Sequence, residues 1–460
     1  MWQCGLPVPC GALILGAACR CDLTDQPIGE FASVPTRHLW LPPALEKPRV
    51  RIYALGHGIS VLGSWVQATA LSWLVFRLTG SVFMLGMMGF LLQIPFLVLG
   101  PFSGRIVDRM PKLPLLIGID LALSIISLTL ALLAWFEIHN VWIYLTAAVL
   151  HGSLNAFEMP TRQSLLARIV EDRALMPSAL GLSATLFNGG RMIGPALAGA
   201  ALLYVSEAWC FLFNAASNLG IIAALLAMKI APEDMSHSRK AAQAGAWSSI
   251  ATLWRLPAVR TLLPMMTVTG LFGVPYVHLM PSISAEFFQG GSSTFGLLMS
   301  AAGLGALTAA AFLSMQRGTE TQRTLIVYAP LVLGVAFTAF AMSRSLPVSM
   351  LLLVVTGGSI MCCANSTNVL LQQSVSDAWR GRAIGLYAMS FQGAAPIGTL
   401  LAGAMASRIG LAATLVINGL VILAAAIVVR RRLAQHPEVF DSVAQMHAIE
   451  AAQVPSREPG

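Results

Sequence analysis

Residues 181–200 read GLSATLFNGGRMIGPALAGA, and residues 385–404 read GLYAMSFQGAAPIGTLLAGA. Several residues of the first stretch recur in the second at a constant offset of 204 positions. The clearest pairs are Phe187 with Phe391, Gly194 with Gly398, and Gly199 with Gly403. A parallel repeat within long apolar segments is typical of membrane transporters that consist of two similar halves with a site between them. The repeat therefore predicts two related halves.

The composition of the chain is that of a polytopic membrane protein. Hydrophobic residues make up 56% of the 460 residues and charged residues only 10%, and the mean hydropathy is +0.74. An average soluble domain carries roughly 25% charged residues, so this chain lacks the polar side chains to cover a soluble surface. Apolar stretches of about 20 residues, long enough to cross a bilayer as a helix, recur along it.

Twelve spans are predicted, in an all-α membrane fold of two pseudo-symmetric six-helix bundles. They run near residues 50–76, 82–103, 113–135, 141–160, 178–204, 208–229, 258–285, 293–315, 324–343, 347–371, 383–406 and 410–430. The polar segment 231–257 is interpreted as a cytoplasmic linker between an N-terminal bundle, 50–230, and a C-terminal bundle, 258–432. Residues 1–49 and 433–460 are interpreted as tails, the first of them flexible.

Lys and Arg predict the orientation of the chain. With the N-terminus inside, the outer loops hold only Arg77, Arg344 and Arg408. The inner loops and ends hold Arg105, Arg109, Lys112, Arg162, Arg168, Arg173, Lys229, Arg239, Lys240, Arg255, Arg260, Arg317, Arg323, Arg380, Arg382, Arg430, Arg431 and Arg432. Because inner loops of membrane proteins are enriched in basic residues, we expect both termini in the cytoplasm of a bacterial cell and the spans in its inner membrane.

Other classes of function find little support. The basic residues that give the net charge of +8 are dispersed among short loops, whereas a nucleic-acid-binding protein gathers them on one soluble face. The seven cysteines lack the paired spacing of a zinc site. There is no P-loop and no Ser/His/Asp set on one cytoplasmic face, so neither an enzyme nor a cofactor is expected.

The composition of the first tail, residues 1–49, bears on where the natural protein starts. Residues 5–18 are apolar but too short to span a membrane, and they lack the basic segment of a signal peptide. Residues 22–49 contain five prolines. We therefore expect that the natural start lies downstream of Met1, which an intact-mass measurement of the mature N-terminus would test.

The turn between the second and third spans contains a motif of glycine and charged residues: Gly104, Asp108, Arg109 and Lys112. A plain basic turn on the inner side is one interpretation. The segment also resembles the signature of the major facilitator superfamily, G-x-x-x-D-R-x-G-R-[RK], with Pro111 in place of the second glycine. The resemblance implies that these residues latch the two halves on the cytoplasmic side.

The fifth span is similar to the antiporter motif of that superfamily, G-x8-G-x3-G-P-x2-G. Four residues match it, Gly181, Gly190, Gly194 and Pro195, and the last glycine is one place late at Gly199. Plain helix packing is the alternative, because a face of small residues lets a second helix approach closely. The resemblance implies export by antiport.

Further segments resemble one branch of the superfamily, that of the enterobactin exporter, the transmembrane secretion effectors and the macrolide efflux pumps. They are residues 62–67 and 73–81 in the first span, 155–163 in the fourth, and 379–382. Many drug–proton antiporters carry an arginine in the fourth span, and Ala148 occupies that position here. Proton coupling through that arginine is therefore not expected.

Charged residues within spans are functional candidates, because a charge at membrane depth costs several kcal/mol unless it is paired or hydrated. Asp120 and Glu158 are the candidate proton-carrying acids. Arg191 lies about 13 residues into the fifth span, near mid-membrane at about 1.5 Å per residue. It either binds an acid or helix carbonyls, or it faces the substrate, which would favour acidic or catecholate-like ligands.

Polar residues recur at helical spacing in four spans, so each set lies on one helix face. The candidate cavity residues are Gln67, His151, Asn155, Asn188, Arg191, His278, Asn365, Asn368 and Gln392. Interhelical hydrogen bonds are the alternative for any one of them. Together the sets predict an aqueous cavity, and nearby Trp, Phe and Met suit a bulky, mostly neutral amphipathic molecule.

The sequence thus predicts a monomeric secondary exporter of a drug-like or siderophore-like molecule, driven by protons and working by alternating access. An importer of the same fold and a non-transporting membrane sensor or scaffold are the alternatives. The antiporter motif weighs against the first, and the lack of a soluble domain weighs against the second.

Overall fold

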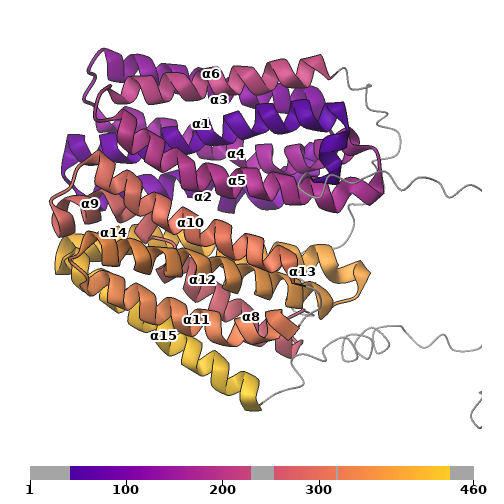
Figure 1. Ribbon diagram of the computed structural model, residues 1–460, viewed down its shortest axis with the longest axis vertical. Coiled ribbons are helices and arrows are strands. Elements are labelled where there is room, and N and C mark those ends of the chain that lie inside the picture. Colours follow the sequence, from indigo (N-terminus) through magenta and orange to yellow (C-terminus); the bar gives the residue numbers. More distant parts are fainter. Residues whose placement is uncertain (1–41, 229–252, 317–319, 436–460) are drawn as a thin grey trace, which may run out of the picture. The chain divides into compact units, whose positions relative to one another are not determined.

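The computed structural model describes residues 42–228, 253–316 and 320–435, and within these ranges every regular element is a helix (Figure 1). The first half contains η1 (Pro43–Glu46), α1 (Pro48–Thr79), α2 (Val82–Asp108), α3 (Lys112–Trp135), α4 (Val141–Val170), η2 (Arg173–Leu175), α5 (Met176–Ala201) and α6 (Glu207–Ala227). The second half contains α8 (Pro257–Val268), the π-helical turn η4 (Thr269–Gly273), α9 (Tyr276–Phe288), α10 (Ser292–Met315), α11 (Glu320–Met342), α12 (Leu346–Gln373), α13 (Asp377–Phe391), α14 (Ala394–Ile409) and α15 (Leu411–Gln435).

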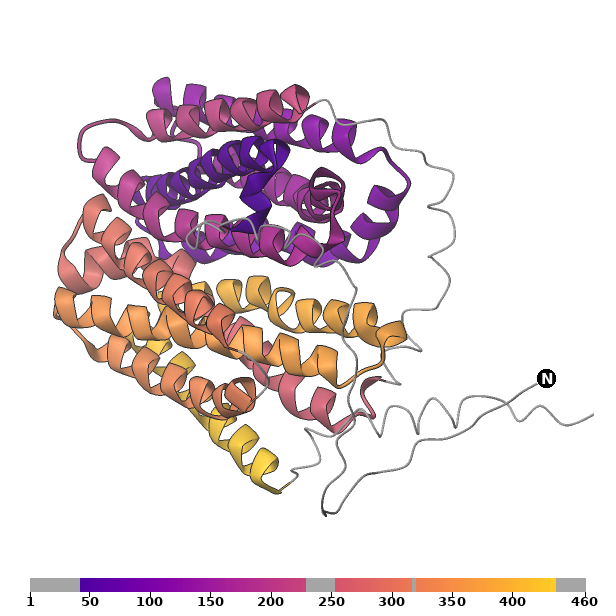
Figure 2. The ribbon, with the colours of Figure 1, turned by 45° about the vertical axis from the view of Figure 1, so that its right-hand side comes forward.

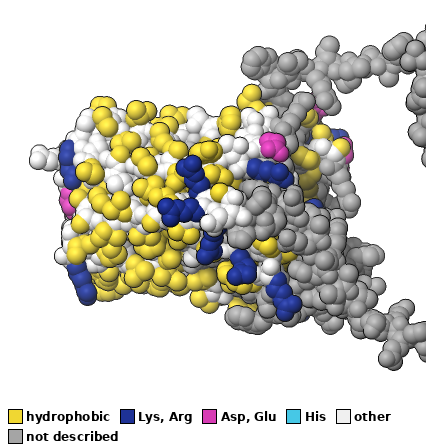
Figure 3. Space-filling view, turned by 90° about the horizontal axis from the view of Figure 1, so that it is seen from below, with side chains coloured by type: hydrophobic (Ala, Val, Ile, Leu, Met, Phe, Trp, Pro, Cys, Tyr) yellow, Lys and Arg dark blue, Asp and Glu magenta, His cyan; other side chains and the backbone are white. Residues whose placement is uncertain are grey.

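All twelve predicted spans are helical. Nine of the described segments are both long and apolar enough to cross a membrane. The other three predicted spans, α4, α5 and the α13–α14 pair, are long enough but are not among those nine. Figure 3 shows a broad area of hydrophobic side chains on one face, with Lys and Arg at its left edge and toward the right. The protein is therefore a multi-pass membrane protein, and the count of twelve spans stays a prediction.

Local sequence signals explain where the helices begin and end. Gly80 ends α1 in the left-handed conformation, with φ of +58°, and its N–H donates to the carbonyl of Phe76. Glycine adopts this conformation without the steric cost that a side chain would add. Ser81 and Asn140 then cap α2 and α4, each accepting a bond from a backbone N–H of the first turn.

Two of the predicted spans are interrupted. The seventh consists of α8, the π turn and α9, and Pro275 precedes α9. The eleventh is divided between α13 and α14 at Gln392 and Gly393. Proline lacks the N–H that would bond the carbonyl four residues earlier, and Pro396 removes that bond from Gln392. Both interruptions lie in the second half of the chain.

Several boundaries differ from the sequence prediction. Residues 43–49, which were assigned to a flexible tail, contain η1 and the start of α1, and the N–H of Ala44 donates to the Ser178 hydroxyl at 3.2 Å. The fourth span continues to Val170 rather than ending at Pro160. The predictions made for residues 1–41 of the first tail, for residues 231–252 of the linker and for residues 436–460 of the last tail lie outside the described residues.

The helices of each half pack mainly on one another, and two pairs, α5 with α10 and α2 with α14, join the halves. Figures 1 and 2 show α1 to α6 in indigo to magenta against α8 to α15 in orange and yellow. Glycines permit these contacts: a Cβ at Gly199 would lie 3.0 Å from the Gly296 Cα, and one at Gly403 would lie 2.8 Å from the Gly86 Cα.

These glycine contacts lie toward the end of the molecule that carries Gly80 and Gly291, which we call the outer end, following the predicted orientation. The opposite end, where α5 and α13 begin, is called the inner end. At Gly181 and Gly385, near the inner ends of the two repeated segments, a Cβ would meet no atom within 4 Å. The backbones of the two halves thus come into close contact at the outer end.

Candidate transport cavity

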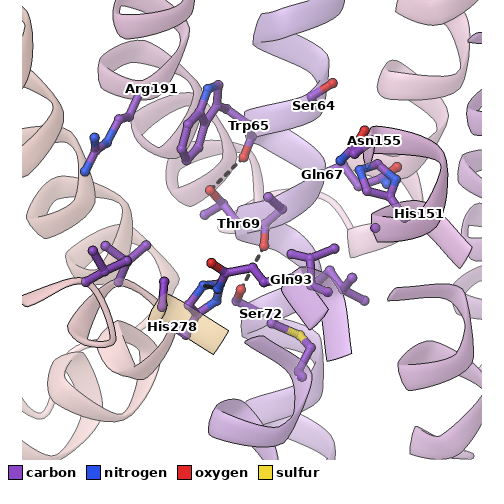
Figure 4. Close-up of a pocket in the computed structure, with 18 of the residues that line it drawn as sticks. Ser64, Trp65, Gln67, Thr69, Ser72, Gln93, His151, Asn155, Arg191 and His278 are labelled. Carbon is purple, nitrogen blue, oxygen red and sulfur yellow. Dashed lines mark hydrogen bonds between the residues drawn. The ribbon is translucent and has the colours of Figure 1, made fainter. Parts of the chain in front are cut away.

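A cavity of about 520 Å³ lies between the two halves and receives side chains from both. Its polar lining residues are Ser64, Gln67, Thr69, Ser72, Gln93, His151, Asn155, Arg191, Tyr276, His278 and Gln392. Most of them are drawn in Figure 4, where Arg191 and Trp65 lie on one side and His151 and Asn155 on the other. The position between the halves is the one that the repeat predicts.

Aromatic and apolar side chains make up most of the remaining wall. Trp65 of α1 contacts Phe187 of α5 edge to face, with ring centroids 5.8 Å apart. Phe391, the repeat partner of Phe187, lines the cavity from the second half, as do Phe295 and Met299. A wall of this kind buries apolar bodies of different shapes, because aromatic rings and methionines pack adaptably.

The structure brings six of the nine predicted cavity residues to the wall: Gln67, His151, Asn155, Arg191, His278 and Gln392. The other three are not among the lining residues. Asn188 is buried and donates to the carbonyl of Ala184 at 2.9 Å, and Asn368 accepts a bond from Gln372 at 3.1 Å. Asn365 is half-buried on the same helix, α12.

Gln67 lies at the wall but is committed to interhelical bonding. Only 3% of it is exposed, and its Oε1 accepts a bond from Asn214 of α6 at 3.0 Å. The Asn214 amide also donates to the Ser127 hydroxyl of α3 at 3.0 Å. Gln67 therefore ties α1 to α3 and α6, as the hydrogen-bonding alternative predicted for it.

Gln93 and His278 join the two halves across the cavity. Gln93 Nε2 lies 2.9 Å from His278 Nε2, so α2 is bonded to α9. Gly89, one turn before Gln93, packs against the same imidazole: a Cβ there would lie 2.6 Å from the His278 Cγ. Gln93 was not among the predicted cavity residues, although a single glutamine within an apolar span indicates a functional or interhelical contact.

Both candidate proton-carrying acids bind one arginine. Asp120 of α3 accepts a bond from Arg162 Nη2 at 3.2 Å, and Glu158 accepts one from Arg162 Nε at 3.1 Å. Asp120 is 1% exposed, and its Oδ2 has no hydrogen-bond partner among the described residues. The stacked rings of Tyr53 and His57 belong to α1, the helix beside α4. None of these residues lines the cavity.

Arg162 was assigned to an inner loop, and that assignment was wrong. The assignment took Pro160 as the end of the fourth span, but α4 continues for ten residues beyond it. Proline is tolerated inside membrane helices where neighbouring groups satisfy the freed backbone. Arg162 is consequently a buried residue, 8% exposed, rather than a loop residue.

The signature turn has a clear structural role for one of its residues. Asp108 ends α2, and exposed Arg109 follows it as the C-cap. Lys112 is buried, and its Nζ donates to the carbonyls of Met110 at 3.0 Å and Asp108 at 3.3 Å. A cation at a helix C-terminus stabilises the free carbonyls and the helix dipole. A Cβ at Gly104 would meet no atom within 4 Å.

The glycines of the antiporter motif contact two different partners. A Cβ at Gly190 would lie 2.7 Å from Val61 Cγ1, and one at Gly194 would lie 2.5 Å from the Trp65 Cβ, both on α1. Gly199 instead contacts α10 of the other half. Gly181 contacts neither, and Pro195 is buried within α5. Gly190 and Gly194 thus pack α5 on α1 of its own half, and Gly199 packs it on α10 of the other half at the outer end.

Comparisons with known proteins agree with this architecture. The family model described as "Transmembrane secretion effector" matches residues 44–457. The chain is 26% identical to the staphyloferrin A transporter of Staphylococcus aureus over 78% of this chain and 90% of that protein. It is 24% identical to macrolide efflux protein A of Streptococcus pyogenes, over 83% and 95% respectively. The crystal structure of the nucleoside transporter NupG superposes with a TM-score of 0.62 at 13% identity, covering 84% of this chain and 99% of that one.

Proposed function

The chain belongs to the transmembrane secretion effector family, within the major facilitator superfamily, and we propose that it exports a small amphipathic molecule from the bacterial cytoplasm. The observation that carries the proposal is the cavity between the halves, with its aromatic wall and dispersed polar groups. Such a wall accepts drug-like and siderophore-like molecules, because it buries an apolar body while a few polar groups orient it.

The names of the relatives support the same class of substrate. One is a transporter of staphyloferrin A and another is a macrolide efflux protein. Both align with most of this chain, 78% and 83% of it respectively. We extend to this chain only the class, a small molecule carried out of the cell.

Transport would proceed by alternating access. Close glycine contacts at the outer end, together with the bond between Gln93 and His278, support an inward-facing state in which the cavity is closed to the outside. Separation of Gly199 from Gly296 and of Gly403 from Gly86 would open it outward. In this proposal Gly104, Asp108, Arg109 and Lys112 form the latch that closes the inner end.

Protons are the proposed source of energy, and Asp120 and Glu158 are the proposed carriers. Arg162 donates hydrogen bonds to both acids, and the second oxygen of Asp120 has no partner among the described residues. A proton bound to that oxygen would therefore weaken the ion pair between Asp120 and Arg162 without displacing another hydrogen-bond partner. The double variant Asp120→Asn, Glu158→Gln is expected to lose gradient-driven transport. Glu207→Gln, which alters a buried acid paired with Arg77, serves as the control. Undiminished gradient-driven transport by the double variant would remove these acids from the proposal.

Efflux of a panel of fluorescent drugs and siderophores from expressing cells tests the function. Cells producing the protein are expected to lose one class of compound in a manner that an uncoupler abolishes. Cells producing the Gly199→Leu variant at equal level are expected to retain it, because a leucine side chain cannot fit against Gly296. Accumulation of a panel compound, instead of its loss, would establish the importer in place of the exporter.

A further inference from the structure

The cavity wall contains one formally charged side chain among the described residues that line it, Arg191 of α5. Tyr276 of α9, in the opposite half, lines the same cavity and interacts electrostatically with Arg191. Neither a carboxylate nor a backbone carbonyl receives a hydrogen bond from Arg191 in the described part of the chain. A guanidinium at membrane depth is costly unless it is paired or hydrated, and Arg191 on the cavity wall has no carboxylate partner among the described residues, so it is available to an anionic ligand.

The hydroxyl of Tyr276 points to the same conclusion. Tyr276 is fully buried and lines the cavity, and its hydroxyl, which interacts with Arg191, donates no hydrogen bond to any described residue. A buried hydroxyl without a partner costs about 1–3 kcal/mol. An anionic oxygen between Arg191 and Tyr276 would accept from both groups and remove both costs at once.

Comparison of the two repeat copies shows that only the first carries this charge. Arg191 corresponds to Ala395 at the offset of 204 residues, and both lie at the cavity wall. The neighbouring aromatic pair, Phe187 and Phe391, is the same in both copies. The cavity therefore has matching apolar walls and a cation on one side only, which would orient a ligand that carries charge at one end.

We propose that the transported molecules are organic anions that place a carboxylate or similar anionic oxygen between Arg191 and Tyr276. Their apolar body lies against Trp65, which Figure 4 shows near the arginine, and against Phe187, whose ring centroid lies 5.8 Å from that of Trp65. The inference rests on the proposed function and narrows its substrate class. Arginine suits this role because its planar guanidinium binds a carboxylate through two bonds and keeps its charge when buried.

Equilibrium binding to the full chain in lipid nanodiscs tests the proposal with matched probes. The pairs are 1-naphthylacetic acid with 1-naphthylacetamide and 4-phenylbutyric acid with 4-phenylbutyramide, which share shape but differ in charge. Wild-type protein is expected to bind each acid at least about tenfold more tightly than its amide, a factor that corresponds to about 1.4 kcal/mol. The Arg191→Gln variant is expected to lose that preference and to keep its affinity for the amides, which also shows that it is folded.

Two further variants complete the design. Arg191→Lys is expected to keep part of the preference, because it keeps the charge without the planar fork. Arg77→Gln removes an arginine at the outer end that pairs with Glu207 at 3.0 Å and lies outside the cavity lining. It is expected to bind both members of each pair as the wild type does.

Equal affinity of wild-type protein for acids and amides, or failure to bind either, would overturn the inference. An acid preference that survives in Arg191→Gln would overturn it as well. If Arg191→Gln does not fold, a reduced acid preference in Arg191→Lys supports the proposal provided that Arg77→Gln retains the full preference, and an unchanged preference in Arg191→Lys contradicts it. Acid binding through Arg191 without cellular efflux would instead remove the export proposal and leave the anion site standing.

Discussion

The two copies of the repeat make equivalent contacts but do not form the same helix. Gly194 packs on Trp65 of the first span, and Gly398 packs on Leu271 of the seventh. In the first copy α5 is continuous from Met176 to Ala201, whereas the second copy is divided between α13 and α14. The small residues that the copies share thus determine which helix each copy packs on. Prolines and glycines that occur in only one copy determine whether that copy forms one continuous helix or two.

The two halves also differ in the number of buried ion pairs that they contain in the described residues. In the described residues the buried ion pairs, those of Arg162 and of Glu207, all lie in the first half. In the described part of the second half, Arg323 pairs at 3.7 Å with Glu320, whose side chain is 88% exposed. Buried ion pairs thus cross-link the first half but not the described part of the second, which predicts different responses to the loss of an arginine in each half.

The largest effect is expected when the charge cluster of the first half is broken. Arg162→Ala leaves Asp120 and Glu158 without their common partner, and loss of one partner of a buried ion pair costs about 3–5 kcal/mol. We expect the midpoint of denaturant unfolding in detergent to fall accordingly. Arg323→Ala, which removes an arginine paired with an exposed acid in the second half, should cost under about 1 kcal/mol. Equal losses in both variants would contradict the difference between the halves.

The next effect concerns the contact that both copies share. Gly199→Leu and Gly403→Leu each place a side chain where a backbone lies within about 3 Å, so each should block closure of the outer end. Overpacking of this kind costs about 1–3 kcal/mol, and we expect transport into proteoliposomes to fall at least about tenfold. Gly220→Leu, at a position that meets no atom within 4 Å, is the control. Full activity of either variant would mean that close approach at that site is dispensable.

The smallest expected change in stability concerns two asparagines that correspond at the repeat offset of 204 residues, Asn214 of α6 and Asn418 of α15. Asn214 bonds Gln67 and Ser127, whereas the amide nitrogen of buried Asn418 has no partner among the described residues. Asn214→Leu should destabilise the protein by about 1 kcal/mol, since such bonds in membranes average about 0.6 kcal/mol and reach about 1.7. Asn418→Leu should be neutral or stabilising. Thermal unfolding of the two variants compares them directly.

The resemblance of the sequence motifs to those of a known family predicted the family. The repeat and the hydrophobic periodicity predicted the helical fold, because both depend on residue spacing that the sequence displays. They also predicted six cavity residues, since helical spacing places polar groups on one face. The breaks at Gln392 and near Pro275 were missed, because proline bends some membrane helices and divides others. Arg162 was misplaced for the same reason at Pro160. Gln93 was overlooked because its partner, His278, lies 185 positions away in the chain.

In the proposed transport cycle the two halves rock about the cavity, and this structure represents the state in which the outer end is closed. Spin labels on a cysteine-free background, at Thr79 and Ile409 for the outer end and at Met110 and Arg382 for the inner end, measure both gaps by pulsed electron resonance. Adding a transported compound from the efflux panel should lengthen the outer distances as the inner distances shorten. An outer distance that stays fixed while the same preparation transports the compound would contradict the account.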